Sequence, residues 1–103
     1  MGMERLRDQV EKESRDLTIL GAVIDSGPIG IVRIAEETGI PEHKVRYSLR
    51  MLEDDGLVEP TPQGAIPADD IADRVADINS GIDRLVARLE EIEASIPAVD
   101  AAE

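Results

Sequence analysis

The side chains best suited to specific chemistry lie close together, between residues 43 and 50. Five of them are hydrogen-bond donors or aromatic, and they are His43, Lys44, Arg46, Tyr47 and Arg50. Arginine donates two parallel hydrogen bonds to a guanine edge, and lysine binds phosphate as a point charge. Val45, Leu49 and Leu52 recur at helical spacing through the same stretch. The pattern predicts one helix with an apolar face and an opposite face suited to the major groove of DNA.

A shorter helix and a tight turn come before this segment. The shorter helix is expected to stop at Gly39, because glycine readily adopts the left-handed conformation that ends helices. Ile40 and Pro41 would form the turn, with Pro41 at the first position of the next helix, and Gly56 would end that helix. Two helices joined by a tight turn, the second of which reads bases, form the helix-turn-helix arrangement.

Three segments resemble winged helix-turn-helix transcriptional regulators of the broad ArsR, MarR and PadR kind. They are Ile34-Ala35-x-x-Thr38-Gly39-Ile40, Val45-x-x-x-Leu49-x-x-Leu52-x-x-x-Gly56-Leu57-Val58 and Thr61-Pro62-Gln63-Gly64. The resemblance covers residues 17–67. It implies a small dimeric DNA-binding regulator with a mainly α fold, in which a short β-hairpin wing follows the helix-turn-helix. It identifies neither an operator nor an effector.

The expected wing is short and carries no basic residue. Pro60 and Pro62 cannot donate to a strand ladder, so any strand here lies at an edge. Residues 61–64 fit a type I turn, with proline second and glycine fourth. No Lys or Arg is available to contact phosphate, so DNA contact by this wing is not expected. The chain also has no Cys and one His, which argues against metal sensing of the ArsR type and predicts no cofactor.

The net charge of −12 requires an explanation, because DNA affinity usually rests on basic residues. Acidic residues are spread along the whole chain, and nine of the eleven basic residues are arginines. Large aromatics are nearly absent. This composition resembles proteins of extreme halophiles, where net charge keeps a protein soluble in concentrated salt. At such salt the Debye length is about 3 Å or less, so repulsion from DNA is screened. We therefore expect a haloarchaeal protein.

A second pattern lies near the C-terminus, where apolar residues alternate at spacings of four and three. They are Ile71, Val75, Ile78, Ile82, Leu85, Leu89, Ile92 and Ile96. A sustained seven-residue repeat is typical of coiled coils. The repeat predicts a helix over 71–96, ended by Pro97, that joins two copies of the chain. Ser80-Gly81 is its weak point, because glycine costs a helix about 1 kcal/mol.

A helix is also expected near the N-terminus, from about Glu4 to Asp25. Its apolar residues fall in one heptad phase that is broken at Glu13, and they are Met3, Leu6, Val10, Leu17, Leu20 and Ile24. Its second half would pack under the helix-turn-helix, and its first half could pack on the C-terminal helices of the dimer. The expected organisation is a winged-helix domain over 1–67, a dimerisation helix over 68–97 and a frayed tail over 98–103.

Catalysis and membrane insertion have little support. No Gly-rich phosphate loop is present, and Asp69, Asp70, Asp73, Glu90, Glu91 and Glu93 read as solvated helix faces. With one His and no Cys as well, the chain is not expected to be an enzyme. No apolar run is long enough to span a bilayer, so the chain is expected to be cytoplasmic.

Three functions remain open at this point. The first is a homodimeric, sequence-specific regulator that binds double-stranded DNA. The second is a winged-helix module that binds proteins instead of DNA. The third is a ligand-sensing regulator with a pocket between the wing and the long helix. The cluster of Lys, Arg and Tyr favours the first.

Overall fold

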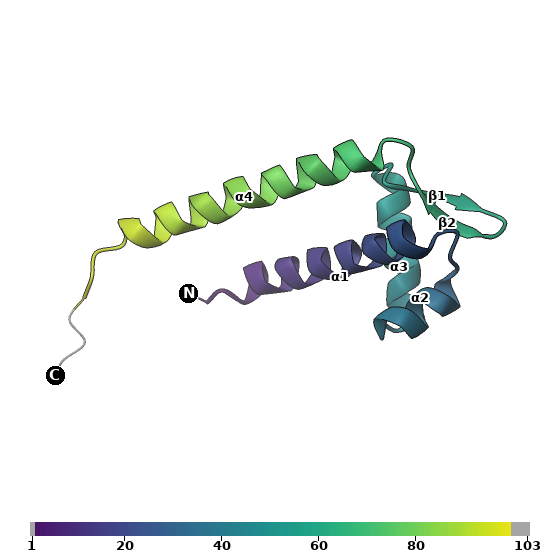
Figure 1. Cartoon of the computed structure of the whole chain (residues 1–103). Coiled ribbons are helices and arrows are strands. Elements are labelled where there is room, and N and C mark those ends of the chain that lie inside the picture. The colour runs from purple at the N-terminus through teal and green to yellow at the C-terminus, as the bar shows by residue number, and fades with distance from the viewer. Residues whose placement is uncertain (1, 100–103) are drawn as a thin grey trace. The chain divides into compact units, whose positions relative to one another are not determined.

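The computed structural model describes residues 2–99 (Figure 1). The chain forms α1 (Glu4–Ser26), α2 (Ile31–Thr38), α3 (Glu42–Asp54), β1 (Val58–Thr61), β2 (Gly64–Pro67) and α4 (Ile71–Ser95). It divides into two compact units, Met1–Ile71 and Ala72–Glu103. Three helices followed by a two-stranded antiparallel hairpin give the first unit the winged helix-turn-helix architecture that the sequence predicts. None of the helices within 2–99 is long and apolar enough to cross a membrane.

The second half of α1 forms one wall of the core. Its buried residues are Asp16, Ile19, Leu20 and Val23, and the helix contacts α2, α3 and β2. The second half of α1 packs on the helix-turn-helix as expected. Of the apolar residues named there from the sequence, Leu20 is buried, Leu17 is half-buried and Ile24 is 40% exposed. The buried set follows the spacing i, i+3, i+4, i+7 of a helix that packs one face on a globular core.

The turn between α2 and α3 has the expected left-handed cap. Gly39 adopts φ 74°, and its N–H donates to the carbonyl of Ala35 at 2.9 Å. The Thr38 hydroxyl donates to Ile34 O at 2.7 Å and accepts from the Ile40 N–H at 3.2 Å. Pro41 lies one residue earlier than expected, at the N-cap with extended backbone, so α3 begins at Glu42. The carbonyl of Pro41 instead accepts the first α3 hydrogen bonds.

The hairpin holds a proline within a strand without losing a hydrogen bond. Pro60 pairs with Ala65 across β1 and β2. The N–H and C=O of Ala65 both bond to the backbone of Ile29, at 2.8 and 3.1 Å. Ala65 therefore directs its polar groups away from β1, and the missing N–H of Pro60 leaves nothing unpaired. Ile29 adds a one-residue bridge on the other side of β2.

The core of the first unit is aliphatic. Its buried side chains are Ile19, Leu20, Val23, Ile29, Ile34, Val45, Leu49, Leu52, Leu57, Val58, Ala65 and Ala68. They come from every element of the unit and from the segments between them. Asp16 and Ser48 are the buried polar residues among those described. The Ser48 side chain is fully buried.

The second unit consists mainly of α4, which runs through Ser80-Gly81 without interruption. It has no buried residue. Five residues of its predicted apolar stripe are at least 43% exposed, and they are Ile82, Leu85, Leu89, Ile92 and Ile96. Ile96 lies just beyond the helix, which ends at Ser95 and not at residue 96. Of the predicted frayed tail, Ala98 and Val99 have no regular structure, and residues 100–103 lie outside the described residues.

Candidate nucleic-acid interface

One face of α3 is anchored in the core. Val45 and Ser48 are fully buried, and Leu49 and Leu52 are at most 7% exposed. Leu57 follows after Gly56, whose φ of 75° reverses the chain, and the Leu57 N–H donates to Leu52 O at 2.9 Å. These contacts fix which side of α3 faces outward.

The outward side carries the five residues singled out from the sequence. His43, Lys44, Arg46, Tyr47 and Arg50 are all exposed. At 3.6 residues per turn, Arg46 and Arg50 lie about 40° apart around the axis, with His43 close to Arg50 and Tyr47 beside it. Lys44 lies about 120° from Arg50, on the flank next to Ser48. The structure therefore places four of the five on one face and Lys44 on another.

The exposed basic side chains of α3 hold no internal partner. Within residues 2–99, the side chains of Arg46, Arg50 and Lys44 make no hydrogen bond or ion pair. By contrast, Arg33 on α2 bonds to Glu37 at 2.9 Å, and Lys12 on α1 pairs with Asp16 at the same distance. The donors on α3 therefore remain available to a ligand that brings acceptors.

Tyr47 is the one aromatic residue of the whole sequence, and it lies outside the core. Its side chain is 51% exposed on α3, between Arg46 and Ser48 in sequence. Aromatic rings normally supply large areas of buried surface. Here the ring is placed where it can contact a partner while its hydroxyl stays free to hydrogen bond.

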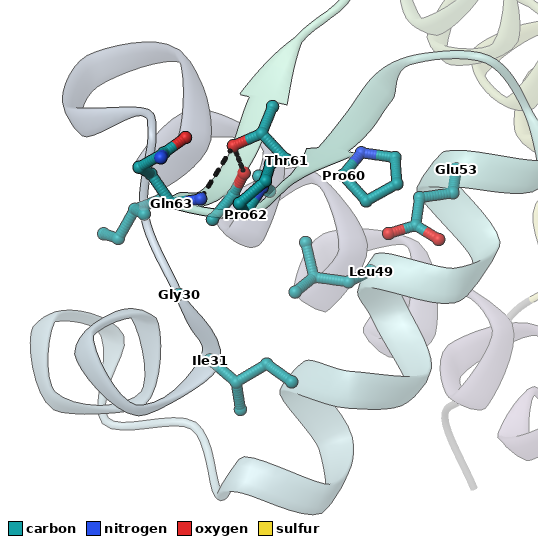
Figure 2. Close-up of a pocket in the computed structure, with 11 residues that line it drawn as sticks. Gly30, Ile31, Leu49, Glu53, Pro60, Thr61, Pro62 and Gln63 are labelled. Carbon is teal, nitrogen blue, oxygen red and sulfur yellow. Dashed lines mark hydrogen bonds between the residues drawn. The ribbon is translucent and has the colours of Figure 1, made fainter.

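The wing lies close to the C-terminal half of α3. A shallow cavity of about 340 Å³ separates the two, and the start of α2 closes its remaining side (Figure 2). Its lining includes Ile31, Leu49 and Pro60, with the Glu53 carboxylate at one edge. The wing tip is Pro62-Gln63, held by the Thr61 hydroxyl, which donates to Gly64 O and accepts from the Gln63 N–H. Neither the wing nor this cavity supplies a positive charge.

The charge of the surface changes sign along α3. Lys44, Arg46 and Arg50 outnumber Glu42 in its first two-thirds, and Glu53-Asp54-Asp55 follow at its end. Phosphate would therefore be attracted to the N-terminal part of α3 and repelled from its C-terminal end. Within residues 2–99 no group of three or more His, Cys, Asp or Glu could hold a metal ion.

This geometry agrees with a comparison against known families. Residues 12–59 match the family model of winged helix-turn-helix DNA-binding domains. The matched segment of this winged helix-turn-helix begins in α1, includes all of α2 and α3, and ends in β1. No curated protein matches the chain. The family match supports DNA as a partner of this domain.

A buried polar pair behind the exposed face of α3 was not predicted from the sequence. Asp16 of α1 and Ser48 of α3 meet in the core, where the Ser48 hydroxyl donates to Asp16 Oδ1 at 2.6 Å. A signal was present, because each polar residue occupies a buried position in the apolar spacing of its helix. Their pairing across 32 residues could not be read from spacing.

Proposed function

We propose that the protein is a homodimeric transcriptional regulator that binds specific DNA sequences through α3. The observation that carries this proposal is the unpaired face of Arg46, Arg50, His43 and Tyr47 on a helix whose other side is clamped in the core. The chain places its single aromatic residue there instead of in the core, where an aliphatic-rich fold would benefit from it most.

The apolar stripe of α4 supports dimerisation. Leu85, Leu89 and Ile92 are 44–59% exposed, and they belong to one unbroken heptad phase. Contiguous exposed apolar surface of this kind marks an interaction site. A second copy of the same helix fits best, because the same stripe on both partners forms a symmetric interface. Met3 at the N-cap of α1 and Leu6 and Val10 on the helix are also 45–60% exposed. We propose that the dimer covers them as well.

The composition supports function in concentrated salt. The described fold carries its acidic residues mostly on the surface, where hydration and salt would balance their repulsion. In such salt, the gain from releasing counterions is small, and specific binding must rely on base-edge contacts and DNA shape. We therefore propose a cytoplasmic regulator of an extreme halophile, without enzymatic activity and without a resident cofactor.

Selection of duplexes from a random DNA library in high salt tests the proposal. We expect a palindromic motif with half-sites about one helical turn, 10–10.5 base pairs, apart. The variant Arg46→Ala/Arg50→Ala should lose the motif. Arg5→Ala/Arg7→Ala changes the net charge equally on exposed sites of α1 and should keep it. If no motif is enriched and the α3 variant retains DNA as the wild type does, the winged helix binds a protein instead.

A further inference from the structure

A buried polar cluster joins α1 to α3 at the centre of the first unit. Asp16 is 5% exposed, and both oxygens of its carboxylate have partners. Oδ1 accepts the hydrogen bond from the Ser48 hydroxyl at 2.6 Å, and Oδ2 lies 2.9 Å from Lys12 Nζ. Arg15 Nε completes the cluster by donating to Ser48 Oγ at 3.4 Å. No buried polar side-chain atom among the described residues lacks a partner.

The rest of the contact between these helices is aliphatic. α1 and α3 are in contact, and their buried apolar residues, such as Ile19 and Val45, are aliphatic. Aliphatic side chains attract one another without a preferred direction. A core whose side chains have the right total volume but do not fit one another closely can still be stable, yet it adopts several packing arrangements instead of one. A hydrogen bond of 2.6 Å is directional, so it selects one arrangement among several of similar packing energy.

The arrangement selected matters because Ser48 lies almost opposite the exposed face. At 3.6 residues per turn, Ser48 and Arg50 are about 160° apart around the axis of α3. A rotation of about 20° would move a side-chain atom 5–6 Å from the axis by about 2 Å. Binding groups must be held within about 0.5 Å and 10–20° of their working geometry. A small rotation of α3 would therefore spoil bidentate contacts to a base.

We infer that the hydrogen bond between Ser48 and Asp16 fixes the rotation of α3, so that both are positioning residues for base reading. This inference rests on the proposed function. A purely stabilising role makes a different prediction, because replacing a buried polar pair with apolar residues of similar volume is often neutral or stabilising. Stability and positioning can therefore be separated experimentally.

The test compares Asp16→Leu/Ser48→Ala with Asp16→Asn. The first removes the whole pair, and the second keeps an oxygen that can accept from Ser48. For each variant, affinity is measured for the selected duplex and for a scrambled duplex in the same salt. We expect the double variant to stay folded while the ratio of the two affinities falls about tenfold or more. Asp16→Asn should keep the ratio within about threefold. An unchanged ratio in the folded double variant overturns the inference.

Two further measurements cover the remaining outcomes. If the double variant does not fold, Ser48→Ala alone replaces it, since that change removes the donor and adds no volume to the core. The amide resonances of residues 42–54 provide a readout without DNA. If the wild type selects no DNA motif, the proposed function fails, and the inference about rotation is then judged by these resonances. Doubled or broadened α3 signals in the variant support it, and a single wild-type-like set overturns it.

Discussion

The ammonium nitrogen of Lys12 lies 2.9 Å from Oδ2 of Asp16, one turn further along α1. This hydrogen bond raises the pKa of Lys12 above its ordinary value of 10.5, against a smaller opposing effect of desolvation, and the Glu13 carboxylate at 3.5 Å adds to the rise. The folded state therefore holds the Lys12 proton more tightly than the unfolded state does.

The first prediction follows from the sign of that shift. The stabilisation from Lys12 is fully present below about pH 10.5, and it is lost as the pH rises through the elevated pKa. Denaturant unfolding of wild type and Lys12→Met from about pH 9 to about pH 12 measures it. The difference in unfolding free energy between the two proteins should shrink over that range. A difference that stays constant with pH would show that the ion pair does not stabilise the fold.

The second prediction ranks three glycine substitutions. Gly64→Ala should destabilise most, by about 2–3 kcal/mol, because φ is 128° and a Cβ would lie 2.5 Å from the carbonyl carbon of Ile29. Gly39→Ala should cost about 1 kcal/mol, since φ is 74° but the surrounding space is open. Gly21→Ala, inside α1 and without close neighbours, should stabilise by about 0.5–1 kcal/mol. Thermal unfolding would reveal the order, and a harmless Gly64→Ala would contradict it.

The third prediction concerns the exposed stripe of α4. Leu85→Asp should dissociate the dimer, because it places a charge in an apolar seam. Ala87→Asp is the matched control, since it adds the same charge at an exposed position away from the stripe. Sedimentation at several concentrations compares both with the wild type. A wild-type protein that stays monomeric at high micromolar concentration in strong salt would remove the basis for a dimer.

The fourth prediction distinguishes the two flanks of α3. Arg46→Ala should weaken specific binding by about 1–3 kcal/mol and relax the base preference, because arginine reads a base edge through two hydrogen bonds. Lys44→Ala should weaken binding to all duplexes alike and lower the salt slope by about 1, as expected for a phosphate contact. Titrations at several salt concentrations measure both. If both changes altered the base preference equally, the distinction between base reading by Arg46 and phosphate contact by Lys44 would be wrong.

The fifth prediction concerns salt. With 23 acidic and 11 basic residues, diluting the salt should expose self-repulsion and lower the melting temperature. Circular dichroism across a range of salt concentrations measures this. A melting temperature that is flat or higher in dilute salt would contradict the halophilic interpretation.

Much of the fold could be predicted because its signals are local. Gly39 marks the end of α2, and the spacing of Val45, Leu49 and Leu52 identifies the buried face of α3. The remaining face then follows by exclusion, which is why the exposed donors could be named from the sequence. The turn residues 61–64 likewise indicated a short hairpin, and Thr61 pairs with Gly64 at its end.

The parts that could not be predicted depend on contacts between distant segments. Leu17 and Ile24 satisfy a heptad phase on paper, but the partners of α1 are short helices and a strand, so a neighbouring set of residues is buried. The hydrogen bond between Ser48 and Asp16 joins two polar residues, each of which interrupts the spacing of apolar residues on the buried face of its helix. Only the folded arrangement shows that these two interruptions face each other.

Two backbone hydrogen bonds between Ile29 and Ala65 connect the wing to the segment that leads into α2. Gly30, the N-cap of α2, follows Ile29 directly. A displacement of the wing tip therefore passes through hydrogen-bonded backbone to the first turn of α2, and α2 packs against α3. A ligand bound at the uncharged wing tip is therefore expected to shift the first turn of α2 as well.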